Sequence, residues 1–354
     1  MRKLYGKKHL NTHELNRLNL LSGLVGSILL GGDCRISKIA EGMSPGREKQ
    51  ESIEKQVHRF LENEHITCED HYLPFIEKVL LQIGKGGELT FIIDGSTVGS
   101  KCMVLMFSVL YKGRAIPLVW SVSRKPKGHF KEGEHIELLE KLAGFVPQGA
   151  KVTVLGDGEF DGTRWQEEIS GMEGWTYVLR TSSKVLLRDA EGECFRPSEV
   201  FVEVGQGLFL ESLRMGKGAY GPVNMLVWHG KGHGSPLYLV TDKDDLGVVA
   251  PSYIRRFYIE TFFRDIKSMG YHINRSRIRS PEKLSRLVMC CCLAYILTIM
   301  SGIKCKKSVV YEIVVSGAKG ALSLFQIGLR FIRKLVDIRQ WRTFSWTHDF
   351  RIET

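Results

Sequence analysis

The pattern of apolar and polar residues divides the chain into a helical beginning, a β-rich middle and a helical end. Between residues 1 and 75, apolar residues recur at the three- and four-residue spacing of amphipathic helices. A short helix is expected over Ser37–Glu41, then a break at Met43-Ser44-Pro45-Gly46, and Ser44 or Gly46 could open the next helix. The apolar stripe of that helix comprises Ile53, Val57, Phe60 and Leu61. The bare pattern fits a helical cap and a DNA-binding unit equally well.

The middle of the chain begins with consecutive apolar runs that predict strands over residues 88–94, 102–111 and 115–123, with a hairpin turn at residues 111–114. A helix is expected over 134–145, a strand over 151–157 and a helix near 162–171. Three strands, a helix, a strand and a helix predict an α/β layer arrangement. In this arrangement the first and fourth strands lie close together.

Residues 175–242 change character, because glycine and charged residues separate short β-prone runs. The strands predicted in this insertion cover residues 176–179, 200–204, 208–213, 223–228 and 237–241. Helices are expected afterwards at about 250–270, 281–303 and 322–338.

The charge of the chain favours a polyanionic partner. Of the 354 residues, 43% are hydrophobic and 25% charged, which is ordinary for a globular protein with a core, and the net charge is +11. Residues 1–75 carry 11 basic and 10 acidic residues, whereas residues 255–286 carry 9 and 3, and residues 303–354 carry 10 and 4. The positive charge therefore gathers in the last third of the chain, where a polyanion would be held.

The cysteines and the long apolar runs exclude several classes of protein. Cys290-Cys291-Cys292 lie in a helical pattern whose neighbouring side chains point about 100° apart, so they cannot share one metal and are interpreted as core residues in a reducing compartment. Residues 18–32 lack a clean cleavage site, and residues 287–303 are short and rich in cysteine. We therefore expect neither export nor a membrane partner.

Three carboxylates occupy positions from which they can converge. Asp94 and Asp157 each follow a short apolar run directly, so both lie at predicted strand ends, and Glu260 lies inside a helical pattern. Such acids can hold a pair of divalent cations, which is the chemistry of phosphodiester cleavage and strand transfer. Glu159 and Asp161 are alternatives to Asp157, although the strand-end position favours Asp157.

Helical spacing brings further polar side chains to Glu260. Tyr253, Arg256 and Lys267 fall with it within about 60° of arc if the helix is continuous. A guanidinium binds phosphate in a bidentate manner and an ammonium supplies a point charge, so this face suits phosphate and metal. The plain alternative is a solvated face with ion pairs four residues apart. The apolar stripe beside it comprises Ile259, Phe263 and Ile266.

The spacing of Tyr253, Arg256, Glu260 and Lys267 resembles the Y-R-E-K motif of the DDE transposases of bacterial insertion sequences. It is most similar to the cut-and-paste group that includes the transposon-five transposase. The resemblance covers about residues 35–300, which is most of the chain.

The two aspartates also resemble those of this family. Asp94, in the sequence IIDGST, matches the setting of the family's first acid, and Asp157, in LGDGEFDG, matches the second. Residues 116–120 resemble the strand between them. Two positions depart from the family, because many relatives have Arg where this chain has Gly158, and Trp where it has Phe257. An aromatic residue at position 257 can still stack on an unpaired base.

The resemblance implies an RNase H-like α/β core with a β-rich insertion, plus helical N-terminal and C-terminal regions. The implied domains are a helical DNA-binding region at 1–80, the first part of the core at 81–174, the insertion at 175–245, the helical part of the core at 246–303 and a basic helical region at 304–354.

The resemblance also implies a chemistry. Asp94, Asp157 and Glu260 would hold two Mg²⁺ or Mn²⁺ ions, one activating water or a 3′-hydroxyl and the other stabilising the leaving oxygen. The partners would be double-stranded DNA, as terminal inverted repeats and as target, and a second copy of the chain in a homodimer. The expected compartment is the cytoplasm, at the nucleoid.

In this interpretation Tyr253, Arg256 and Lys267 would grip phosphates of the transposon end. Two other functions stay open, namely an RNase H-like nuclease without strand transfer and a non-catalytic DNA-binding protein derived from a transposase.

Three other residues have less specific patterns. His229 and His233 have a spacing that could serve a metal, but they lie in a glycine-rich turn that favours a surface loop. Trp228 is expected to pack rather than to stack on a base.

Overall fold

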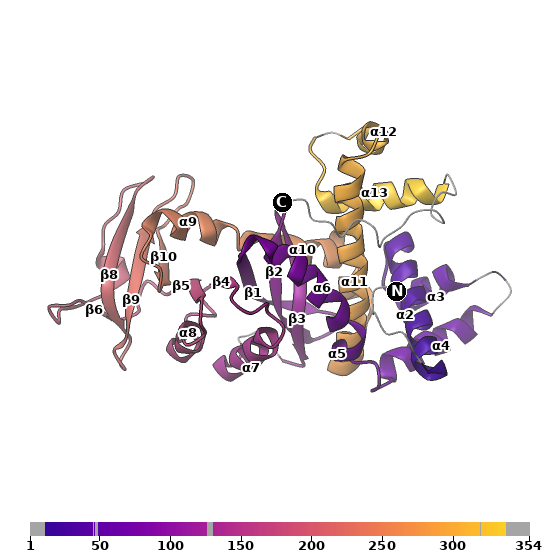
Figure 1. Ribbon diagram of the computed structural model, residues 1–354, viewed down its shortest axis with the longest axis horizontal. Helices are drawn as coiled ribbons and strands as arrows, with labels where there is room; N and C mark the ends of the chain where they lie inside the picture. Colours follow the sequence, from indigo (N-terminus) through magenta and orange to yellow (C-terminus); the bar gives the residue numbers. More distant parts are fainter. Residues whose placement is uncertain (1–10, 45, 47–48, 126–129, 319, 338–354) are drawn as a thin grey trace.

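The computed structural model describes residues 11–44, 46, 49–125, 130–318 and 320–337. The molecule is elongated, with the N-terminal helices at one end and the β insertion at the other (Figure 1). The described residues form a ten-stranded sheet in the order β3-β2-β1-β4-β5-β10-β9-β8-β6-β7.

The first five strands confirm the predicted fold class. They are β1 (Glu88–Val98), β2 (Cys102–Tyr111), β3 (Arg114–Ser123), β4 (Lys151–Gly156) and β5 (Trp175–Arg180). β1, β4 and β5 run parallel, and β2 is antiparallel to both β1 and β3. The order 3-2-1-4-5 with the second strand reversed is that of an RNase H-like core. As predicted, the first and fourth strands are neighbours.

Helices cover both faces of this part of the sheet. Figure 1 shows α7 (Glu132–Ala143) and α8 (Thr163–Ser170) along its lower side and α9 (Leu246–Ile254) and α10 (Phe257–Arg264) along its upper side. Because both faces are buried, β1 is apolar in consecutive positions rather than in alternation. Its fully buried run comprises Phe91, Ile92 and Ile93.

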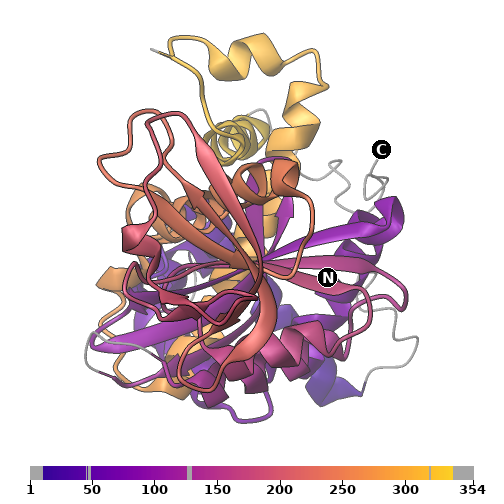
Figure 2. The ribbon, with the colours of Figure 1, turned by 90° about the vertical axis from the view of Figure 1, so that its left-hand side faces the viewer.

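The β insertion continues the sheet. Its strands are β6 (Leu187–Arg188), β7 (Cys194–Phe195), β8 (Gly207–Met215), β9 (Tyr220–Trp228) and β10 (Leu237–Thr241), with a 3₁₀ turn η2 (Pro197–Glu199) between β7 and β8. β10 pairs antiparallel with β5, and β5 pairs parallel with β4, so the hydrogen bonds between β4 and β5 cross the boundary predicted near residue 175. Figure 2, which views the molecule from this end, shows the strong twist of the strands. The predicted domain boundaries stay a prediction.

One predicted strand of the insertion, over residues 200–204, is wrong. Of its alternating valines only Val202 is buried, while Phe201 is 84% exposed. The backbone bonds of this segment go to loops, because Gly205 N donates to the carbonyl of His229 and Gln206 N to that of Glu203. The described residues of this segment therefore do not pair with a neighbouring strand.

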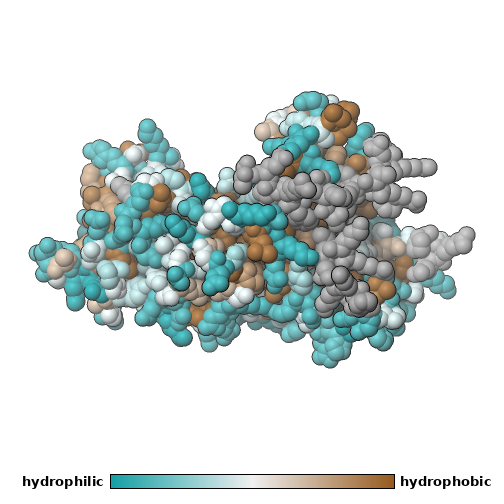
Figure 3. Space-filling view, in the orientation of Figure 1, coloured by the Kyte–Doolittle hydropathy of each residue, from teal (hydrophilic) through white to brown (hydrophobic). Residues whose placement is uncertain are grey.

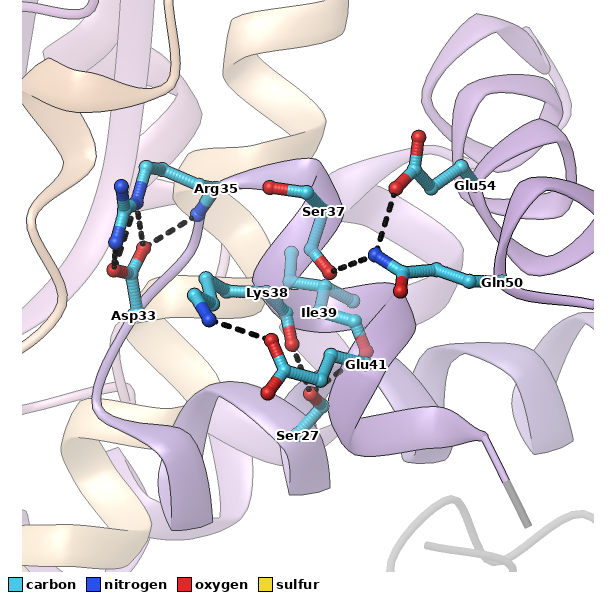
Figure 4. A network of polar contacts seen from close by, with 9 residues as sticks. All are labelled: Ser27, Asp33, Arg35, Ser37, Lys38, Ile39, Glu41, Gln50 and Glu54. Carbon is cyan, nitrogen blue, oxygen red and sulfur yellow. Dashed lines mark hydrogen bonds and ion pairs between the residues drawn. The ribbon is translucent and has the colours of Figure 1, made fainter. Parts of the chain in front are cut away.

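The N-terminal helices follow the predicted breaks. They are α2 (Thr12–Gly31), α3 (Ile36–Met43), α4 (Gln50–Glu62), α5 (Cys68–His71) and α6 (Leu73–Ile83), followed by the 3₁₀ turn η1 (Gly84–Gly86). Neither Ser44 nor Gly46 opens α4, whose N-cap is Lys49. Figure 4 shows how polar side chains join these helices, since Ser27 Oγ donates to the carbonyl of Ile39 at 2.9 Å.

The long helix α11 (Pro281–Lys306) stands between the sheet and the N-terminal helices (Figure 1). Among the described helices it alone is long and apolar enough to cross a membrane by itself, and 78% of its most apolar window is buried inside the protein. α2 and α3 pass the same test only together, and they are bent by 101°. Cys290, Cys291 and Cys292 are fully buried, as predicted for core residues.

The C-terminal part packs on α11. It comprises α12 (Tyr311–Val315), which the sequence did not predict, and α13 (Leu324–Asp337), which it did; the predicted end at residue 338 lies outside the described residues. α11 and α13 approach so closely that a Cβ on Gly328 would lie 1.9 Å from the carbonyl oxygen of Thr298. Figure 3 shows hydrophobic atoms over α12, where Ile313 is 60% exposed.

The single helix predicted over residues 250–270 is wrong in detail. α9 ends at Ile254, a tight turn follows, and α10 then passes into a π-helical turn, η3 (Asp265–Met269), and the 3₁₀ turn η4 (Ile273–Arg275). At the break, backbone N–H groups bond to the carbonyl three residues earlier instead of four. Arg256 N donates to the carbonyl of Tyr253, and Ile259 N donates to that of Arg256. The predicted apolar stripe is buried all the same, at Ile259, Phe263 and Ile266.

Candidate active site

The parallel pairing of β1 and β4 brings the two aspartates together. Ile92 pairs with Leu155, so Asp94 and Asp157 stand opposite each other two residues further on. Neighbouring strands lie about 5 Å apart, and residues in register point to the same face. The first two acids therefore meet on one face of the sheet.

Glu260 reaches the same place from α10, which packs on β1 and β3. Between the acids lies the guanidinium of Arg256. Its Nη2 donates to Glu260 Oε1 at 2.6 Å, and its Nη1 lies 3.8 Å from Asp94 Oδ2. The Arg256 side chain is only 12% exposed, so this bridge is largely shielded from water.

The acids are crowded enough to oppose each other's ionisation. Burial, together with the charges of Asp157 and Glu260, raises the pKa of Asp94 to about 7, although Arg256 opposes the shift. One guanidinium thus neutralises three carboxylates only in part. The site retains a strong demand for positive charge.

The donor set fits Mg²⁺ or Mn²⁺, which prefer carboxylate oxygen. As arranged, however, the described part of the chain contains no group of three or more His, Cys, Asp or Glu residues close enough to hold a metal. The reason is local, because Arg256 lies between Asp94 and Glu260.

The other motif residues surround this centre despite the broken helix. Tyr253 is buried, and its ring centroid lies 5.9 Å from Arg256 Cζ. Lys267 Nζ donates to Ser96 Oγ at 2.5 Å. Burial lowers the pKa of Lys267 to about 8, and the charge of Asp94 opposes this shift.

The two alternative acids have other partners. Glu159 Oε1 accepts from the backbone N–H of Phe130 at 2.7 Å, and Asp161 Oδ2 accepts from Thr181 Oγ1 at 2.6 Å. Asp157 Oδ1 accepts only a local bond, from Glu159 N at 3.0 Å. The geometry therefore favours Asp157 as the second acid.

Sequence reasoning missed two features of the site. Ser96, the partner of Lys267, lies two residues beyond Asp94, so strand alternation puts both on one face and could have revealed it. The second feature is the buried ion pair between Arg114 and Asp265, which no spacing in the sequence indicates.

Exposed aromatic and basic residues follow Arg256 along the chain. Phe257 is 62% exposed and Tyr258 36% exposed, directly after Arg256. Arg275, Arg277 and Arg279 follow and are all exposed, and in the described part of the chain their side chains have no hydrogen bond or ion pair.

The histidine pair is no metal site in this arrangement. His229 Nε2 lies 3.0 Å from the carbonyl oxygen of His233, and its Nδ1 lies 3.4 Å from that of Val202. Trp228 packs against His233, with ring centroids 5.6 Å apart. Both observations agree with the predicted structural roles.

The fold and the site define a class of protein with an RNase H-like core and converging acids. A family model matches part of the chain. Residues 134–297 match the model of a family described as "Transposase DDE domain". This segment contains Asp157 and Glu260 but not Asp94, whose assignment therefore rests on strand register.

Among solved structures, the chain is similar to a piggyBac transposase in a synaptic complex with hairpin DNA. The identity is 12% and the TM-score 0.47, over 94% of this chain and 73% of that chain. No curated protein matches the chain.

Proposed function

We propose that this protein is a DDE transposase that cleaves and rejoins DNA at the ends of an insertion sequence by a cut-and-paste route. The observation that carries the proposal is the convergence of Asp94, Asp157 and Glu260 on Arg256. It occurs in a chain whose residues 134–297 match a transposase domain.

The three carboxylates would hold two Mg²⁺ or Mn²⁺ ions, which supply an activated water or 3′-hydroxyl and stabilise the leaving oxygen. Arg256 would have two partners in turn. Without DNA its guanidinium neutralises Asp94 and Glu260, and with DNA a phosphate offers it a bidentate anionic partner. The departure of Arg256 would open the acids to the metal.

The DNA would continue from the acids along the exposed arginines. The carbonyl of Ile278 accepts from Ser100 N at 3.1 Å, which fixes the segment carrying Arg275, Arg277 and Arg279 against the turn after β1. At about 3.3 Å per residue, that turn lies roughly 15–20 Å beyond Asp94. This is about five base pairs of a duplex.

Three further parts of the proposal follow the family resemblance. A homodimer would form around paired transposon ends, and the reaction would take place in the cytoplasm at the nucleoid. Phe257 would stack on an unpaired base at the cleaved end.

The test uses a labelled duplex carrying the inverted repeats that flank the reading frame, incubated with the full chain and Mg²⁺. We expect cleaved ends and joined products. Asp157→Ala should abolish both while DNA binding persists. The matched control is Asp161→Ala, which should still cleave because that carboxylate bonds Thr181.

Each other outcome contradicts part of the proposal. Cleavage by the Asp157→Ala protein would overturn the assignment of that acid. Nicks without joined products would indicate a nuclease without strand transfer. Binding without any cut would indicate a non-catalytic DNA-binding protein.

A further inference from the structure

A buried ion pair lies beneath the π-helical turn that carries Lys267. Arg114 Nη1 lies 3.0 Å from Asp265 Oδ2, and the two residues are 8% and 4% exposed. Arg114 is the first residue of β3, and Asp265 is the first residue of η3. The pair therefore joins the sheet to the start of the wide turn.

Stability alone does not explain this pair. Phe262 and Tyr295 are both fully buried and pack edge to face, with ring centroids 4.8 Å apart. Burial also raises the pKa of Asp265 to about 6, although Arg114 opposes the shift. In such dry surroundings an apolar pair of similar volume is often as stable or more so. The best-attested benefit of a buried ionic group is a fixed register.

The register of this helix decides where Lys267 points. A π-turn takes in one residue more than an α-turn, so the residues after it are rotated by up to about 100° from their α-helical positions. Such turns are rare and frequently occur at functional sites. Lys267 lies inside the turn, two residues after Asp265, and its Nζ reaches Ser96 Oγ.

Ser96 lies on the same face of β1 as Asp94, two residues further along. Asp265 thus holds the turn to β3, and the turn directs Lys267 to β1 beside the acids. Ile266, which separates Asp265 from Lys267 in the sequence, is 1% exposed.

We propose that Arg114 and Asp265 are positioning residues, which lock the register of the π-turn so that Lys267 can hold a DNA phosphate beside the three acids. The inference rests on the proposed function, because it assigns a cause to the placement of one of its phosphate-binding residues.

The test measures the salt dependence of DNA binding without divalent metal, so that cleavage plays no part. Lys267→Ala should lower the slope of log K against log salt by about 1, as the loss of one phosphate contact does. Arg114→Met combined with Asp265→Leu should lower it by the same amount. Adding Lys267→Ala to that protein should cause no further loss, because the contact is already gone.

Two controls separate positioning from general loosening. Tyr271→Phe removes a buried hydrogen bond to Thr298, 2.7 Å long, from a residue just after the same turn in the chain, and should leave the slope unchanged. Asp265→Asn keeps the shape and weakens the pair, so it should give an intermediate slope. Near-ultraviolet circular dichroism shows whether the Arg114→Met, Asp265→Leu protein folds. If it does not fold, Asp265→Asn takes its place in the test.

If the folded variants of Arg114 and Asp265 keep the wild-type salt slope while Lys267→Ala lowers it, the inference is overturned and the proposed function stands. The same conclusion follows if adding Lys267→Ala to the Arg114→Met, Asp265→Leu protein lowers the salt slope further. An unchanged slope in Lys267→Ala alone removes that lysine from the proposed function and the inference with it.

Discussion

At the scale of single residues, Arg256 governs the charge of the site. It is nearly buried between Asp94 and Glu260, and it lies beside the ring of Tyr253. The acids repel each other and demand a cation, and the guanidinium supplies one from within the chain. In the proposed function, a metal ion would compete with this guanidinium for the same carboxylates.

This competition gives a prediction for the protein without DNA. Arg256→Ala should raise its affinity for Mn²⁺ about tenfold or more, equivalent to about 1.4 kcal/mol, because the competing charge is gone. Titration with Mn²⁺, monitored by electron paramagnetic resonance, measures this affinity. Arg255→Ala, an exposed neighbour, is the matched control and should bind Mn²⁺ as the wild type does. An unchanged affinity in the Arg256→Ala protein would show that the guanidinium does not compete.

At the scale of elements, the segment from α9 to η3 replaces the expected single helix. The tight turn at Arg256 lets its side chain turn inward, and the π-turn brings Lys267 onto β1. The motif residues thus meet through two irregularities rather than along one helical stripe. Asp265 begins the second irregularity, and its burial affects the stability of the whole segment.

The raised pKa of Asp265 predicts how stability varies with pH. The folded carboxyl holds its proton up to about pH 6, whereas the unfolded one loses it near 3.8, so the folded state binds more protons between these values. Its contribution to the free energy of unfolding should therefore fall from about pH 4 to pH 6, by on the order of 3 kcal/mol, and stay constant above. Urea unfolding of the wild type and of Asp265→Asn across this range measures the difference. Parallel curves for the two proteins would contradict the prediction.

At the scale of the whole molecule, β1, β4 and α10 lie in the middle of an elongated chain, between the β insertion and the helices around α11 (Figure 1). Arg286 fastens α11 to the N-terminal helices, since its guanidinium donates to the carbonyls of Leu61 and Ile66 at 2.9 and 3.0 Å. The exposed arginines just before α11 lie between this helical part and the acids along the chain. They extend the positive surface away from the site.

This arrangement predicts a uniform loss of DNA affinity for Arg277→Ala. The salt slope should fall by about 1, and duplexes of unrelated sequence should be affected equally, because a phosphate contact carries no sequence information. The control is Lys85→Ala, an exposed residue just before the start of β1, at the other end of that strand from the arginine segment. Fluorescence anisotropy over a range of salt concentrations measures both. A loss confined to one sequence would indicate base reading instead.

The sequence by itself determined the strands of the core, the closeness of the first and fourth strands and the buried faces of the helices, and it singled out Asp94, Asp157 and Glu260 as candidate acids. Those features depend on local periodicity and on residues that directly follow apolar runs, as Asp94 and Asp157 do. The motif spacing around Glu260 was informative even though the helix is broken, because the chain returns its residues to one centre.

Tertiary structure alone decided the partners of these residues. Arg114 and Asp265 are 151 residues apart, and no spacing in the chain links them. The same holds for the bond between Lys267 and Ser96, 171 residues apart, and for the π-turn that makes it possible. Local periodicity records only which face of an element is buried, whereas the side chain that meets another across that face depends on the packing of the whole chain.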